Sequence, residues 1–166
     1  IVPAIADFLK ENNSLEIELN FYSKKVDLIE DAYDVVIQVG ARTDINVINK
    51  PLAKTTFKLV ASPHFLNQYG SPEDPHDLKH LRCLRFTEYG TSKPWKFIRD
   101  EDAVSVNGLT YWHSNSGHCL LAAARDGLGM AYLPDYYLAE DIKSGALVEI
   151  LDQWHGIERD IVAIYQ

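Results

Sequence analysis

His76 and His80 are the first residues of this sequence whose types and spacing suggest chemistry, because histidines at i and i+4 on one helix face can bind zinc. The pattern matches the HExxH motif of zinc metalloproteases only in part. Asp77 stands where that motif has its general-base glutamate, and its carboxylate is one methylene shorter. No acid or histidine further along is placed as a third ligand. The sequence therefore favours a surface helix with solvated histidines, and we expect no metal site.

Ser114 and Ser116 lie between His113 and His118, which brings nucleophile and base types together. No Gly-x-Ser-x-Gly elbow accompanies them, so a serine hydrolase is not indicated. Gly127-Leu128-Gly129 precedes a predicted strand, the reverse of the order that a dinucleotide-binding loop needs. We assign no catalytic residue and expect no cofactor.

Two helix N-termini that directly follow strands are better candidates for a binding site. Ser23 follows a strand that ends at Phe21, and residues 113–116 follow a strand that ends at Trp112. Free backbone N–H groups and the helix dipole at such ends favour an anion or a carbonyl oxygen. Two such ends facing each other across a cleft would form a small-molecule site. The plainer interpretation is that Ser23 and Ser116 only cap their helices.

Hydrophobic periodicity predicts the elements that position these residues. Helices are predicted at residues 3–11, 23–31, 62–70, 76–81, 117–125 and 134–145. Strands are predicted at residues 15–21, 35–39, 56–61, 83–86, 95–98, 103–106, 109–112, 129–133, 147–151 and 161–165. The second of these strands is apolar enough to be covered on both faces, so residues 15–39 predict a right-handed βαβ unit. Asn107-Gly108 predicts a two-residue hairpin.

The composition of the chain limits the classes of protein to which it can belong. The 166 residues are 46% hydrophobic and 24% charged, which is typical of a globular protein. Sixteen basic residues against 24 acidic ones give a net charge of −8, which argues against nucleic-acid binding by this chain itself. Cys83 and Cys119 lack CxxC spacing, so neither a disulfide framework nor a zinc ribbon is indicated. The beginning at Ile1 and the strand that stops at Gln166 suggest a fragment of a longer protein.

The order of these features resembles the effector-binding domain of LysR-type transcriptional regulators almost from end to end. The stretches that carry the resemblance are Pro3-Ala4-Ile5-Ala6-Asp7-Phe8-Leu9, Val26-Asp27-Leu28-Ile29-Glu30-Asp31, Tyr33-Asp34-Val35-Val36-Ile37, Ala61-Ser62-Pro63, Asp77-Leu78, Trp95-Lys96-Phe97, Asn107-Gly108, Ala122-Ala123-Ala124, Gly127-Leu128-Gly129-Met130-Ala131, Leu133-Pro134 and Gly145-Ala146-Leu147-Val148.

The resemblance implies an α/β fold of two Rossmann-like lobes of the type II periplasmic-binding-protein kind, joined by two crossing strands at residues 57–61 and 161–165. Residues 1–61 and 159–166 would form an incomplete first lobe, and residues 62–158 the second lobe. Effector contacts carried over by position are Ser23, Gln38, Gly40 and Ala41 in the first lobe, and Arg85, Phe86, Thr87, His113, Ser114, Asn115 and Ser116 in the second.

The function that the resemblance implies is effector sensing in a cytoplasmic bacterial regulator. A small molecule, which could be a carboxylate, would control a homodimer or tetramer that touches DNA only through an N-terminal winged helix-turn-helix outside this chain, and no membrane contact is expected. A periplasmic solute-binding protein for transport, with the same architecture, is the alternative. A cleft enzyme that uses His113 and Ser116 is a third hypothesis.

Overall fold

The computed structural model describes residues 1–22, 26, 28, 30–41, 47–88 and 90–166. The helices are α1 (Val2–Glu11), α2 (Pro63–Tyr69), α3 (Gly117–Arg125) and α4 (Ala139–Ser144), with 3₁₀ turns η1 (Pro75–His80) and η2 (Asp135–Tyr137). The strands are β1 (Val36–Val39), β2 (Ile48–Ala61), β3 (Arg82–Phe86), β4 (Trp95–Arg99), β5 (Asp102–Val106), β6 (Leu109–Ser114), β7 (Met130–Pro134), β8 (Val148–Ile150), β9 (His155–Gly156) and β10 (Glu158–Tyr165).

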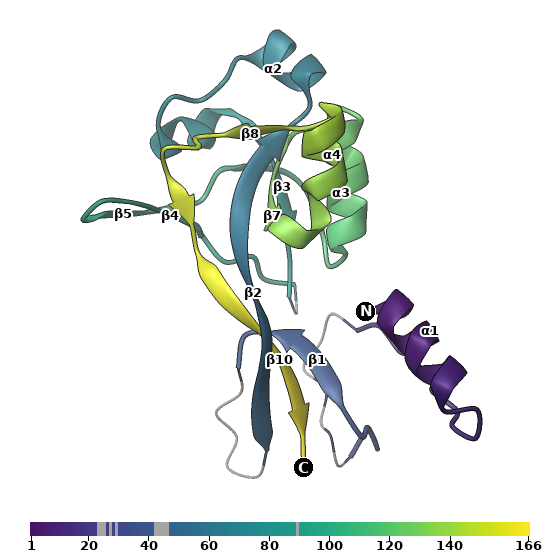
Figure 1. Cartoon of the computed structure of the whole chain (residues 1–166). Helices are drawn as coiled ribbons and strands as arrows, with labels where there is room; N and C mark the ends of the chain where they lie inside the picture. Colours follow the sequence, from purple (N-terminus) through teal and green to yellow (C-terminus); the bar gives the residue numbers. More distant parts are fainter. Residues whose placement is uncertain (23–25, 27, 29, 42–46, 89) are drawn as a thin grey trace.

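Two strands, β2 and β10, connect the two parts of the molecule (Figure 1). We call residues 57–157 the upper body; β1, β10 and residues 48–56 of β2 form the lower sheet. The larger sheet has the order β1-β10-β2-β7-β3-β6, with β8 also paired to β2. Through Thr56, β2 pairs with β10, and from Phe57 onward it pairs with β7 and β8. The crossing strands are thus present, and β2 is longer than its predicted range of 56–61.

Pro51 explains why the start of β2 escaped the sequence analysis. Proline cannot donate to a strand ladder, so it is confined to edges and bulges. In the structure Pro51 faces Val162, and the register of β2 against β10 shifts between Ile161 and Val162. The irregular pairing accommodates proline without ending the strand.

The predicted strand 15–21 is wrong, since residues 15–22 have no regular structure. Its alternating apolar side chains stay in solvent, from 40% exposed at Ile17 to 81% at Phe21. A strand needs a hydrogen-bonded neighbour, and no described residue pairs with this segment. The βαβ unit is therefore not formed: β1 pairs antiparallel with β10, and Ile37 and Val39 are exposed, which also contradicts the expected burial of both faces. In the helix predicted at 23–31, residues 23–25, 27 and 29 lie outside the described residues.

The predicted hairpin at Asn107-Gly108 is also wrong. β5 pairs antiparallel with β4, while β6 pairs parallel with β3, so this dipeptide connects two different sheets. A Cβ at Gly108 would collide with the Cys83 thiol and lie 3.2 Å from the Leu78 carbonyl oxygen. Close packing between strands, rather than turn geometry, accounts for this glycine.

Most elements of the upper body are confirmed. α3 has the predicted bounds, and Ser62 and Ser116 cap α2 and α3 by accepting from backbone N–H groups. Residues 134–145 form η2 and α4 instead of one helix, and β9 was not predicted. η1 is a 3₁₀ turn with three residues per turn, so His76 and His80 do not share a face, which removes the geometry of the zinc motif.

Among the described residues, three apolar clusters hold these elements together. One lies between the two sheets and includes Phe97, Met130 and Trp154. Another lies where α3 packs on the larger sheet and includes Leu84, Leu120 and Leu133. The lower sheet has a small cluster of Leu28, Val162 and Ile164. The second cluster fixes α3 against β3 and β7, which positions the candidate site. No helix of the described residues is long and apolar enough to cross a membrane.

Candidate functional site

The carboxyl ends of parallel strands β3 and β6 bring two of the predicted residue groups together. Phe86 lies opposite Ser114 in the register, and the Thr87 N–H donates to the Ser114 carbonyl oxygen at 3.0 Å. Residues 113–116 then lead from β6 into the N-terminus of α3. This is the strand-end arrangement at which α/β proteins collect ligands.

Ser114 and Ser116 order the entry into α3. The Ser114 hydroxyl accepts from the Ser116 N–H at 3.1 Å, and the Ser116 hydroxyl accepts from the Cys119 N–H at 3.3 Å. Phe86, His113 and Asn115 are exposed beside them. The structure thus confirms Ser116 as a helix cap, and ligand binding by these residues stays a prediction.

Tyr137 also lies at this helix end, and the sequence analysis missed it. A Cβ at Gly117 would lie 2.8 Å from Cζ and 2.9 Å from the hydroxyl oxygen of Tyr137, so this ring packs on the first turn of α3. The ring of His118 meets it edge to face at 4.9 Å between centroids. Tyr137 follows β7, the third parallel strand, and applying the strand-end rule to β7 would have found it.

Arg85 does not lie at the surface with its neighbours. Successive strand residues face opposite sides: Leu84 joins the cluster beneath α3, whereas Cys83 joins the cluster between the sheets. Arg85 faces the same side as Cys83 and is only 1% exposed. Its guanidinium lies 5.2 Å from the centroid of the Trp95 ring. Burial lowers the pKa of Arg85 from its ordinary value, and its contact with effector stays a prediction.

The first-lobe candidates lie at the end of β1. The Gln38 side-chain amide donates to the Gly40 carbonyl oxygen at 2.8 Å, and the Gly40 N–H donates to the Asp160 carbonyl oxygen at 2.7 Å. Ala41 is exposed, and Ser23 lies outside the described residues. No hydrogen bond among the described residues joins Gln38, Gly40 or Ala41 to the strand-end group of the upper body, so a shared site stays a prediction.

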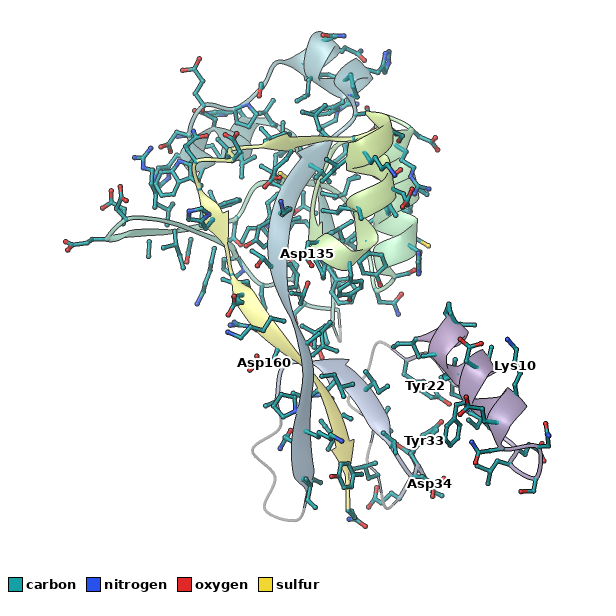
Figure 2. All side chains as sticks on the ribbon, viewed as in Figure 1. Lys10, Tyr22, Tyr33, Asp34, Asp135 and Asp160 are labelled. Atoms are coloured by element: carbon teal, nitrogen blue, oxygen red, sulfur yellow. The ribbon has the colours of Figure 1, made fainter. Side chains whose placement is uncertain are left out.

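A separate pocket of about 390 Å³ lies among β2, η2 and α4 and is lined by Lys58, Asp135, Tyr136, Ala139 and Ile142. Asp135 lies beside β2 (Figure 2) and accepts from the Thr55 hydroxyl at 2.7 Å and the Thr56 N–H at 3.3 Å. These bonds tie the end of β7 to the point where β2 leaves the lower sheet. Across the described part of the chain, no group of three metal-ligating side chains comes together.

With this geometry established, comparison with known proteins identifies the family. The whole chain, residues 1–166, matches the family model described as LysR substrate binding domain. This chain belongs to that family. Its two-sheet α/β architecture accordingly has the type II periplasmic-binding-protein-like fold of these regulatory domains.

Its relatives carry regulator names. The chain is 31% identical over 165 residues to an uncharacterized HTH-type transcriptional regulator of Haemophilus influenzae, covering 99% of the chain and 57% of that protein. It is 31% identical over 171 residues to the uncharacterized HTH-type transcriptional regulator YhjC of Escherichia coli, covering 99% of the chain and 56% of that protein. The chain thus spans little more than half the length of these relatives.

Solved structures of regulatory domains superpose on this chain. The regulatory domain of AphB from Vibrio vulnificus superposes with a TM-score of 0.87 at 27% identity, covering 100% of this chain and 83% of that one. The CrgA regulatory domain from Neisseria meningitidis gives a TM-score of 0.86 at 25% identity, covering 99% of this chain and 80% of that one. The fold and family expected from the resemblance are thereby confirmed.

Proposed function

We propose that the chain senses a small effector for a LysR-type transcriptional regulator, with DNA bound by a winged helix-turn-helix elsewhere in the full-length protein. The observation that carries this proposal is the family match over all 166 residues, in a chain whose strand ends and α3 N-terminus converge on one surface. The regulator names of the relatives support it. They do not favour the transport alternative, nor an enzyme that uses His113 and Ser116.

The proposed effector site lies between two lobes, with residues 62–158 as the second lobe and residues 1–61 with 159–166 as the first. Its second-lobe wall is the group Phe86, Thr87, His113, Ser114, Asn115 and Ser116. Its first-lobe wall is Gln38, Gly40 and Ala41, with Ser23. The separate apolar clusters of the upper body and the lower sheet support this division.

Effector acts by population shift in this proposal. A ligand that binds one arrangement of the lobes more tightly than another biases a homodimer or tetramer toward one DNA-bound state, by no more than its differential affinity. The protein works in the bacterial cytoplasm, where both DNA and metabolites are available, and has no membrane role.

A thermal-shift screen of the full-length protein against small metabolites, followed by DNA retention assays, tests the proposal. A metabolite present at about 100 times its dissociation constant adds roughly 2.7 kcal/mol to the free energy of unfolding. We expect such a metabolite also to change which genomic DNA fragments the protein retains. A full-length protein that retains no specific DNA, with or without stabilising metabolites, would refute the regulatory role.

A further inference from the structure

The pocket of about 390 Å³ beside β2 shares no residue with the proposed effector walls. Its lining comes from β2, η2 and α4, through Lys58, Asp135, Tyr136, Ala139 and Ile142. Pockets of this size hold small molecules when apolar walls surround a few polar groups. This lining has both kinds of residue, so the pocket can take a ligand of its own.

Asp135 is the charged group of this pocket that has no ionic partner. Its carboxylate accepts from the Thr55 hydroxyl at 2.7 Å and from the Thr56 N–H at 3.3 Å, and both donors are uncharged. Among the residues that the structure describes, no lysine, arginine or histidine forms an ion pair with it. An ionised carboxylate can accept about four hydrogen bonds, so acceptor positions on Asp135 stay open.

The cation of the lining is already neutralised. Lys58 Nζ lies 2.7 Å from Oε2 of Glu149, across the paired strands β2 and β8. Because this pair is neutral in sum, the Asp135 carboxylate leaves the pocket negatively charged. The net charge of the chain, −8, has the same sign. Both charges attract a cation and disfavour an anion.

The remaining walls suit an ammonium group with a short hydrocarbon body. The ring of Tyr136 packs on that of Tyr137 at 4.7 Å between centroids, and Tyr136 lines the pocket. An aromatic ring attracts an ammonium group that lies over its face. Ala139 and Ile142 are three positions apart on α4 and therefore lie on the same side of that helix. They provide the apolar contact.

We propose that this pocket binds a small primary amine in its protonated form. The ammonium group lies against the Asp135 carboxylate and the Tyr136 ring, and the hydrocarbon contacts Ala139 and Ile142. The ligand binds where β2 changes its partner from β10 to β7, beside one of the two strands that connect the upper body with the lower sheet. This site goes beyond the proposed function and does not depend on it.

Butylammonium chloride is the probe, and 1-butanol and ammonium chloride are its controls. The alcohol keeps the hydrocarbon without the charge, and ammonium keeps the charge without the hydrocarbon. Ligand-observed NMR on the full-length protein measures the three dissociation constants at about pH 7, where the amine is protonated, and at constant ionic strength. We expect butylammonium to bind about tenfold more tightly than either control, since the charged and the apolar contact both contribute. Equal affinity for butylammonium and either control would overturn the proposal.

Asp135→Asn removes the charge and keeps an oxygen that can accept from the Thr55 hydroxyl. Asp152→Asn is the matched control, because Asp152 is exposed and lies outside the lining of the pocket. We expect butylammonium to bind Asp135→Asn about tenfold more weakly, through loss of a charge-assisted hydrogen bond, and to bind Asp152→Asn as it binds wild type. An unchanged affinity of Asp135→Asn contradicts the proposal.

Ala139→Phe tests the pocket while Asp135 keeps its charge and its hydrogen bonds. Ala139 is exposed at the start of α4, so a larger side chain there fills the pocket without repacking the core. Ala146→Phe, at an exposed position outside the lining, is its control. We expect only Ala139→Phe to lose most of the affinity for butylammonium. If Asp135→Asn does not fold, this pair of variants decides, and equal affinity of the two refutes the site.

Discussion

The upper body and the lower sheet contain similar apolar sequences but bury them to different extents. In the upper body, β3 and β7 lie between α3 on one face and a second sheet on the other, and both faces carry buried side chains. In the lower sheet, β1 is an edge strand with alternate residues exposed, and the nearby segment 15–22 has no strand partner among the described residues. α1 lies to one side of this sheet (Figure 1), and its described residues include no buried side chain. The difference shows that apolar alternation becomes buried structure only where a second layer covers it.

Truncating one leucine in each region should show this difference in burial most strongly. Leu84 is 1% exposed beneath α3, whereas Leu52 on the lower part of β2 is 49% exposed. We expect Leu84→Ala to lower the free energy of unfolding by about 2–5 kcal/mol, because it opens a cavity. Leu52→Ala should cost less than about 1 kcal/mol. Urea denaturation measures both, and similar losses would show that the lower sheet is better covered in the full-length protein than in this structure.

Tyr132→Phe should give the next largest loss. The Tyr132 hydroxyl donates to the Lys96 carbonyl oxygen at 2.7 Å and accepts from the Ile157 N–H at 2.9 Å, which joins β7 to the central strand β4 of the smaller sheet and to the residue after β9. Losing the hydroxyl removes both of these part-buried hydrogen bonds, and we expect about 1–3 kcal/mol of destabilisation. Tyr33→Phe is the control from the lower region, because the Tyr33 hydroxyl bonds to that of Tyr22 near the surface, where the two rings point toward each other (Figure 2). Tyr33→Phe should lower the free energy of unfolding by less than Tyr132→Phe does. Equal losses would contradict the difference in burial between the two regions.

Alkaline pH should destabilise the upper body through Cys83. Burial raises the pKa of this thiol from 9.0 to about 12, with the Arg85 charge lowering it to a lesser degree. Between these two pKa values the folded protein keeps a proton that the unfolded chain releases. The contribution of the buried neutral thiol to the free energy of unfolding is therefore complete below pH 9 and falls as pH rises. Cys83→Ala should therefore flatten the decline in the free energy of unfolding by up to about 1.4 kcal/mol per pH unit. Denaturation curves across this range give the slope; the exposed thiol variant Cys119→Ala should keep the wild-type slope.

Two serines that cap helices of the upper body allow a structural role to be separated from a binding role. Ser62 and Ser116 each accept a backbone N–H at 3.3 Å, but only Ser116 lies at the strand-end site. Each change to alanine should cost about 1 kcal/mol of stability, as loss of an N-cap does. We expect only Ser116→Ala to weaken binding of a stabilising metabolite, measured by calorimetry. Equal affinity in both variants would mean that Ser116 only caps α3.

The sequence predicted the upper body well because local signals and tertiary contacts agree there. Ser116 begins α3, Gly127 follows its end, and Leu120, Leu121 and Ala124 are buried as their spacing requires. The strand-end rule also selected residues 113–116, and the family resemblance implied Phe86 and Thr87, which the structure brings together with them. The rule was not applied to Tyr137. For the first-lobe candidates the sequence gives positions only, since their meeting with the upper body depends on lobe geometry.

Local chemistry alone determined where α2 and α3 begin, which residues follow β6 and, through the order of motifs, the family. Pairing was decided by tertiary structure. The Asn107-Gly108 dipeptide predicts a hairpin from its nearest neighbours, yet the following strand β6 pairs in parallel with β3. Residues 15–21 alternate between apolar and polar side chains without forming a strand. The orientation of Arg85 was likewise fixed only when β3 was buried on both faces. Caps and periodicity depend on neighbours within a few residues, whereas strand partners and side-chain burial depend on segments distant in the sequence.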